Sequence, residues 1–164
     1  MNELSPAGAS SELGLLPQWN LGDLYQSTSA PALEADLTRA AEESKAFRQA
    51  WEGKLATASG EALGQAIAAY DKLQDLMGRI GSFASLYYAQ DQADPERGSF
   101  SQNVSEKLTD VGAKLVFFRL ELNKLEDADL AEKQKDQALA KYGPWLRDLR
   151  VWRPHQLSDE MEKA

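Results

Sequence analysis

Few side chains in this sequence could do catalysis. His155 is the single histidine and there is no cysteine, so thiol nucleophiles, disulfides and thiolate metal ligands are absent. A catalytic zinc typically needs three protein ligands and an open position, and His155 has only carboxylates as possible co-ligands. Asp127 and Asp129 could act as acid and base only if their surroundings separated their pKa values, and both instead suit a helix start. We therefore predict no catalytic residue and no metal site in this chain, and a loop position for His155.

An arginine cluster near the C-terminal end is the clearest candidate for binding an anion or stacking on a base. It consists of three arginines interleaved with two tryptophans, namely Arg147, Arg150, Arg153, Trp145 and Trp152. The chain as a whole has 18 basic and 26 acidic residues, a net charge of -8, which repels the phosphate backbone. We expect the arginines to pair with acids or stack on the indoles, and we expect neither nucleic acid nor a membrane as a partner.

Helix start and stop signals divide most of the chain into segments with helical spacing. Pro31 suits the first position of a helix that ends near Gly53, and Ser59 is a predicted N-cap for a second helix of about eight turns. Gly78 and Gly81 in that second helix have the spacing that lets a neighbouring helix approach closely. Asp94-Pro95-Glu96 combines a capping carboxylate, a first-turn proline and an acid, the strongest start signal in the sequence.

The segment that follows Pro95 is the most periodic. Its apolar residues recur every three or four positions and predict one continuous helix to about residue 125: Phe100, Val104, Leu108, Val111, Leu115, Phe118, Leu122 and Leu125. Asp127 and Asp129 can begin a fourth helix, which Gly143-Pro144 would end, and residues 145–152 form a short fifth element. No alternating pattern predicts a strand, so the sequence predicts an all-α fold, an antiparallel bundle of long helices.

The domain organisation follows from composition. Residues 1–15 mix small and polar residues without a period and read as a flexible leader. We expect residues 16–157 to form one helical lobe, in which the segment around Trp19 to Tyr25 is strapped onto the folded body. Residues 158–164 resemble the start of a new helix that Ala164 interrupts, with Ser158 as its N-cap.

Several blocks, in order, resemble the N-terminal region of oligoendopeptidase F, a bacterial branch of the thimet-oligopeptidase-like zinc metallopeptidases. They are Trp19-Asn20-Leu21-Gly22-Asp23-Leu24-Tyr25, the helix from Tyr70 to Tyr88, Asp94-Pro95, Leu115 to Leu122, and Arg153-Pro154-His155-Gln156-Leu157-Ser158 with Glu162-Lys163. The resemblance implies an all-α N-terminal lobe that forms part of a substrate-channel wall in a cytoplasmic zinc endopeptidase of short peptides. The family's His-Glu-x-x-His motif is missing here, so the resemblance implies zinc and activity only for a longer parent protein.

This resemblance also implies partners and surfaces. The partners would be a C-terminal catalytic lobe of the same polypeptide and, in the parent, short peptides; the isolated chain is expected to self-associate. Candidate channel or interlobe residues are Tyr87, Tyr88, Gln90, Phe117, Leu120 and Trp152. A self-contained helical module that binds a partner protein is the alternative from a different functional class.

Overall fold

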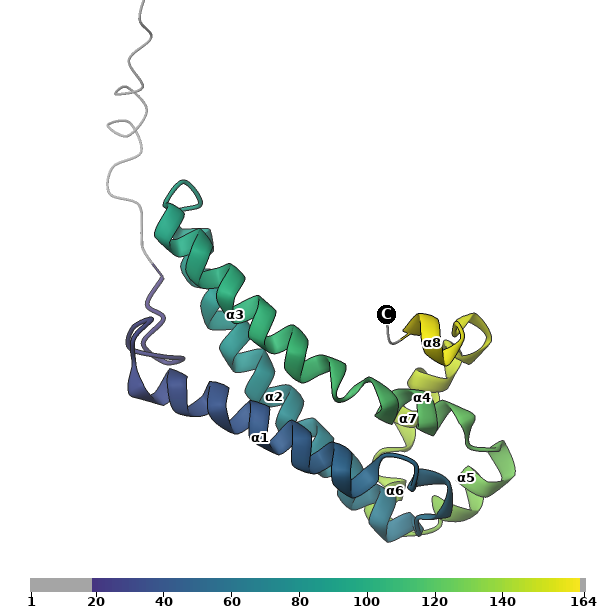
Figure 1. Cartoon of the computed structure of the whole chain (residues 1–164). Helices are drawn as coiled ribbons and strands as arrows, with labels where there is room; N and C mark the ends of the chain where they lie inside the picture. The colour runs from purple at the N-terminus through teal and green to yellow at the C-terminus, as the bar shows by residue number, and fades with distance from the viewer. Residues whose placement is uncertain (1–18, 163–164) are drawn as a thin grey trace, which may run out of the picture.

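The computed structural model describes residues 19–162, apart from the side chains of residues 159 and 160. Helices account for most of this range and no strand occurs within it, which confirms the all-α class (Figure 1). Within the same range, no helix is both long and apolar enough to cross a membrane. The predicted leader, residues 1–15, lies outside the described residues.

The first two helices begin where the sequence predicts. α1 (Pro31–Trp51) has its proline in the first turn, and the chain leaves it through Gly53, whose φ of 76° is the left-handed conformation that glycine adopts without strain. A short 3-10 turn, η1 (Leu55–Thr57), leads to α2 (Gly60–Gln90). The Ser59 side chain accepts a hydrogen bond from the Ala62 backbone N–H at 3.1 Å, so it is the N-cap of α2.

The third helix, α3 (Pro95–Ala113), is capped as predicted by Asp94, whose carboxylate accepts the Glu96 N–H at 2.8 Å. Figure 1 shows α2 and α3 as a long hairpin, with α1 along one side of it. The apolar side chains between these three helices form one cluster, around Leu33, Ala40, Ile80, Phe83, Val104 and Val111.

The single helix predicted from Pro95 to about residue 125 is wrong. The chain makes a turn at Lys114 and Leu115, where the Leu115 N–H donates to the Gly112 carbonyl at 2.8 Å, and α4 (Val116–Lys124) begins after it. Gly112, just before this turn, has a low helix propensity. After the break, the adjacent Phe117 and Phe118 both lie in the core, at 3% and 0% exposure. The apolar period continues across the break, which hides the turn from a pattern of spacing alone.

The predicted fourth helix is also divided. It consists of α5 (Asp127–Lys133) and α6 (Gln137–Ala140), and Asp136 caps α6 by accepting the Ala138 N–H at 2.8 Å. Gly143 and Pro144 do not end this segment; they form the first turn of α7 (Gly143–Val151), because proline at the start of a helix loses no hydrogen bond. A 3-10 turn, η2 (Arg153–His155), and α8 (Asp159–Glu162) follow.

A second core cluster joins this region of short helices to the N-terminal half of α2. It is built around Phe118, which has no exposed surface, and includes Leu55, Leu63, Leu122, Leu139 and Leu146. The described part of the chain therefore has a long three-helix part and a part of short helices, and α2 contributes to the core of both.

The predicted strap at the N-terminal end is confirmed for residues 19–25. Tyr25 is 3% exposed, its hydroxyl donates to Asp36 at 2.7 Å, and its ring packs edge-on against Phe83. Arg79 donates to the Leu24 carbonyl at 2.6 Å and lies over the Tyr25 ring. Burial, with the bond to Asp36, raises the pKa of the Tyr25 hydroxyl to about 12.

Candidate functional site

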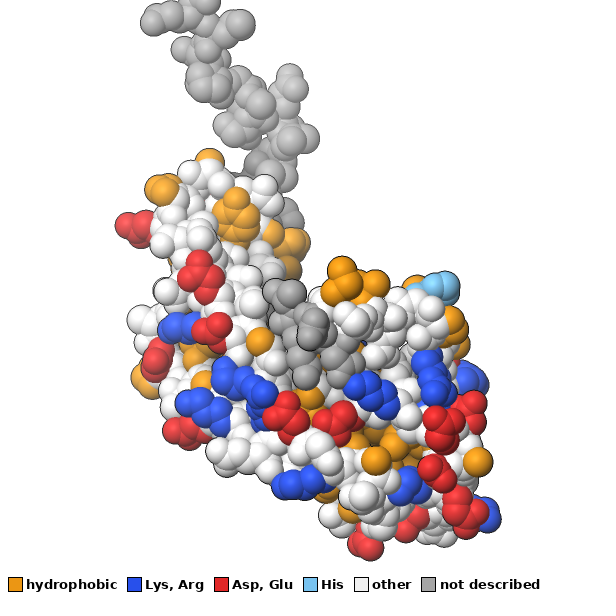
Figure 2. All heavy atoms as spheres, turned by 45° about the vertical axis from the view of Figure 1, so that its right-hand side comes forward, with side chains coloured by type: hydrophobic (Ala, Val, Ile, Leu, Met, Phe, Trp, Pro, Cys, Tyr) orange, Lys and Arg blue, Asp and Glu red, His pale blue; other side chains and the backbone are white. Residues whose placement is uncertain are grey.

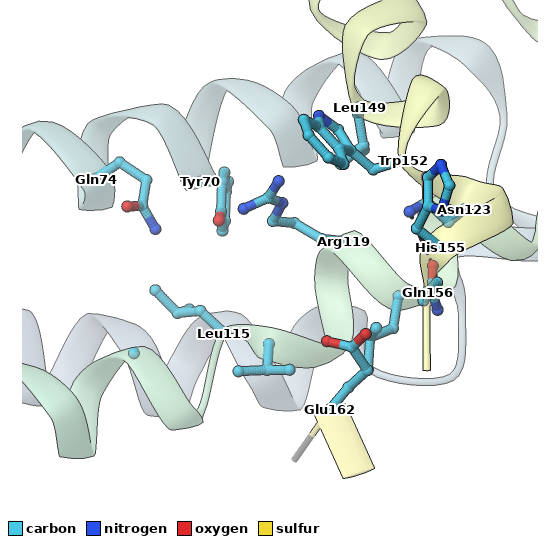
Figure 3. Close-up of a pocket in the computed structure, with 13 residues that line it drawn as sticks. Tyr70, Gln74, Leu115, Arg119, Asn123, Leu149, Trp152, His155, Gln156 and Glu162 are labelled. Atoms are coloured by element: carbon cyan, nitrogen blue, oxygen red, sulfur yellow. Dashed lines mark hydrogen bonds between the residues drawn. The ribbon is translucent and has the colours of Figure 1, made fainter. Parts of the chain in front are cut away.

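A cavity of about 400 Å³ lies where α2, α4, α7, η2 and α8 meet (Figure 3). Its apolar wall includes Leu115, Leu120 and Leu149, which are nearly buried. Its polar and aromatic lining consists of Tyr70, Gln74, Arg119, Asn123, Trp152, His155, Gln156 and Glu162. This volume lies within the range of pockets that hold small molecules.

One face of α4 forms the floor of the cavity. Val116, Arg119, Leu120 and Asn123 line it at spacings of three, one and three residues, which places them on the same side of a helix. Tyr70 and Gln74 come from consecutive turns of α2 in the same way. The cavity therefore depends on the break between α3 and α4, which turns this face of α4 toward α2.

Two side chains of opposite charge face the cavity. Figure 3 shows Arg119 extending toward Tyr70, while the Glu162 carboxylate faces the same space from α8. One Glu162 oxygen accepts the Leu157 N–H at 2.9 Å. Tyr70 is largely buried, and this burial raises the pKa of its hydroxyl, while the nearby Arg119 charge acts in the opposite direction.

Asn123 and Gln156 connect α4 to the segment after η2. The Asn123 side-chain nitrogen donates to Gln156 Oε1 at 2.9 Å, and Asn123 is 7% exposed. Its Oδ1 is buried and accepts no hydrogen bond within the described residues. This pair fixes the wall of the cavity that carries His155 and Gln156.

Two predicted surface residues are buried instead. Phe117 is 3% exposed and packs against Phe47 at a ring separation of 5.9 Å, so it is a core residue. Leu120 is 6% exposed and lines the cavity from α4. The prediction that both lie on an exposed side of the third helix fails because that helix is broken before them.

Trp152 is exposed as predicted, at 66%. Three further large apolar side chains nearby in sequence are similarly exposed, and together with Trp152 we call them the C-terminal apolar patch: Val151, Leu157 and Met161. Figure 2 shows hydrophobic side chains gathered next to His155, which packs edge-on against Trp152. Sequence analysis missed Val151, Leu157 and Met161, although their place in the short, weakly periodic final segment was a usable signal.

Tyr87, Tyr88 and Gln90 lie far from this cavity. Tyr87 is 17 residues beyond Tyr70 in α2, a separation of roughly 25 Å along a helix. Arg97 lies over the Tyr87 ring and donates to Gln90 Oε1 at 2.9 Å, so these residues stabilise the tip of the α2–α3 hairpin. Tyr88 lies beside a shallow polar groove along α3. The structure therefore does not bring the two groups of predicted site residues together.

The arginine cluster pairs internally, as expected. Arg150 donates to the carbonyls of Leu122 and Leu125 at 3.1 and 2.7 Å and pairs with Asp127, while Arg147 pairs with its neighbour Asp148. His155 is exposed in the η2 turn. Among the described side chains, no three of the His, Asp or Glu type come close enough together to hold a metal ion, so these residues do not fit a zinc site.

Comparison with known proteins gives one informative match. Residues 121–164 match the N-terminal family model described as Oligopeptidase F, which confirms the resemblance to the N-terminal region of oligoendopeptidase F. The matched range contains the C-terminal apolar patch and part of the cavity lining. No curated protein and no solved structure gives a significant match.

Proposed function

We propose that this chain is the non-catalytic N-terminal helical lobe of a cytoplasmic zinc metalloendopeptidase of the oligoendopeptidase F type, which hydrolyses short peptides. The match of residues 121–164 to the N-terminal family model carries this proposal. Zinc and the catalytic glutamate would come from another part of the parent protein, since the described residues do not fit a metal site. The lobe would form part of the wall of the substrate channel.

The C-terminal apolar patch supports a docking role for this lobe. Four large apolar side chains with more than half of their surface exposed, Val151, Trp152, Leu157 and Met161, occur within eleven residues of a chain that is otherwise rich in charge. Exposed apolar patches commonly mark interaction sites. We propose that the catalytic lobe of the same polypeptide covers this patch.

The reading frame beyond residue 164 tests the proposal first. A His-Glu-x-x-His motif encoded downstream supports the peptidase, because that motif supplies two zinc ligands and a general base. A stop codon directly after residue 164 contradicts it and favours the self-contained interaction module.

A binding experiment tests the docking face. The downstream lobe is produced separately and titrated with this chain, and Trp152→Glu and Met161→Glu are each expected to weaken binding at least tenfold because they place a charge in an apolar contact. Trp19→Glu is the matched control, since Trp19 is 57% exposed but lies outside the patch. Equal binding by all variants would show that the lobes meet elsewhere.

Self-association of the isolated chain is expected from the same patch. Sedimentation velocity at rising concentration should show dimers for the unmutated 164-residue chain and fewer dimers for Trp152→Glu. Phe117→Asp and Leu120→Asp do not serve this purpose, because both residues are buried and a charge there would unfold the protein. An unmutated 164-residue chain that stays monomeric at high concentration would contradict this expectation.

A further inference from the structure

The cavity between α4 and α8 holds two opposite charges that do not neutralise each other. Arg39, Arg48, Arg79, Arg97, Arg147, Arg150 and Arg153 each have a carboxylate oxygen within 4.0 Å. Among the described residues, Arg119 is the one arginine without such a partner, although the chain carries an excess of acids. Its guanidinium is therefore available to a carboxylate that enters the cavity.

Glu162 supplies the complementary charge on the opposite side. One of its oxygens accepts the Leu157 N–H, and the other has no hydrogen bond within the described residues. A carboxylate can accept several hydrogen bonds, so Glu162 can still bind a cationic donor. A simple anion would be attracted by Arg119 but repelled by Glu162. A simple cation would be attracted by Glu162 but repelled by Arg119.

Between these charges the walls are apolar and aromatic. Leu115, Leu120 and Leu149 lie beside the ring systems of Tyr70 and Trp152. Such a lining favours a ligand with an apolar body, and the volume of about 400 Å³ admits one of small size.

We infer that this cavity binds a small zwitterion with an apolar body, its carboxylate on Arg119 and its ammonium on Glu162. A free apolar amino acid and a dipeptide share this chemistry. The inference goes beyond the proposed function, since it requires neither a catalytic lobe nor peptide hydrolysis.

Calorimetric titration of the whole chain tests the inference with L-leucine as the probe. L-leucinamide lacks the carboxylate and N-acetyl-L-leucine lacks the ammonium, and each is expected to bind about tenfold more weakly than leucine, the usual effect of losing one charged hydrogen bond. Titration with L-leucyl-L-leucine distinguishes the two sources, because the tighter of the two ligands identifies the preferred length.

Two variants assign the charges. Arg119→Gln should remove the preference for leucine over leucinamide, and Glu162→Gln should remove the preference for leucine over N-acetylleucine. Arg147→Gln is the control, because Arg147 is exposed, pairs with Asp148 and does not line the cavity. Far-UV circular dichroism verifies that each variant is folded.

Three results would overturn the inference. They are the absence of binding by both leucine and leucyl-leucine at millimolar concentration, equal affinities for leucine, leucinamide and N-acetylleucine, and equal effects of Arg119→Gln and Arg147→Gln. None of these results bears on the docking of a catalytic lobe, which the Trp152→Glu titration measures separately.

Discussion

Gly64 of α2 is a position where adding one methyl group should destabilise the fold. A Cβ atom there would lie 2.4 Å from the Ala138 carbonyl oxygen and 2.9 Å from the Ala138 Cβ. Atoms at those distances overlap, and most of the opposing atoms belong to the backbone of α6, which cannot rotate away. In Gly64→Ala, α2 and α6 would have to separate by about 1 Å, since ordinary contact begins near 3.4 Å.

Gly78 is a matched control in the same helix. Nothing lies within 4 Å of a Cβ built there, so Gly78→Ala gains helix propensity without a clash. That gain is about 0.8–1 kcal/mol, whereas overpacking costs about 1–3 kcal/mol or more. We expect Gly64→Ala to lower the free energy of unfolding by about 2 kcal/mol and Gly78→Ala to raise it by about 0.5–1 kcal/mol.

Thermal unfolding followed by circular dichroism measures both changes. For a chain of this size 1 kcal/mol corresponds to about 2–4 °C, so Gly64→Ala should lower the melting temperature by about 4–8 °C and Gly78→Ala should raise it by about 1–4 °C. A Gly64→Ala variant as stable as the parent would refute the close approach of α2 and α6. So would a Gly78→Ala variant that is the less stable of the two.

Three further predictions concern the core, an arginine and a tyrosine. Phe118→Ala should cost about 3–5 kcal/mol in urea unfolding because Phe118 has no exposed surface, whereas Glu132→Ala, 71% exposed, should cost under about 1 kcal/mol; similar costs would contradict the core assignment. Arg150→Met should cost about 2–4 kcal/mol because it removes hydrogen bonds to two backbone carbonyls and to the Asp127 carboxylate, and Arg147→Met under about 1 kcal/mol; equal costs would show that the Arg150 bonds add nothing. The pKa of Tyr25 is raised to about 12 from an ordinary value near 10, so the folded state holds its proton more tightly and stability falls as pH rises from about 10 toward 12; Tyr25→Phe should flatten this part of the curve, and an unchanged slope would contradict the assignment.

The starts of the three long helices were predictable from this sequence because each is determined by local chemistry. Helices begin at Pro31, after Ser59 and after Asp94, where these side chains satisfy or replace free N–H groups. Helix ends and breaks were less predictable, because they depend on tertiary packing. The turn at Leu115 keeps the apolar spacing of a continuous helix, and only the neighbouring helices determine that the chain bends there.

The glycines show the same division between local and tertiary signals. Gly78 and Gly81 were expected to permit a close helix contact, yet Gly78 faces open space and Gly81 would meet only the end of the Leu108 side chain, at 3.3 Å. The close contacts are at Gly60 and Gly64, where a Cβ would meet α5, α6 or the segment between them. Spacing pointed to Gly78 and Gly81, whereas the close contacts at Gly60 and Gly64 follow from the packing of the short helices against α2.

The cavity could not be predicted, although every residue that lines it was visible. Arg119 and Glu162 are 43 positions apart, and their placement on one cavity requires the α4 turn, the return through α7 and the bond from Asn123 to Gln156. In a predicted continuous helix, Arg119 would be an ordinary solvated cation on a polar face. The break that buries Phe117 and Phe118 also turns Arg119 toward α2, so one local turn determines both the core and the charged lining.

The short helices from α4 to α8 combine three features that the long α2–α3 hairpin does not share. They contain most of the range that matches the oligopeptidase F model, all of the C-terminal apolar patch and most of the cavity lining. Helices of four to nine residues are not stable alone, so their order depends on contacts such as those of Phe118 and Arg150. A partner that covers Trp152 and Met161 would add contacts to α8, which is a single turn of helix.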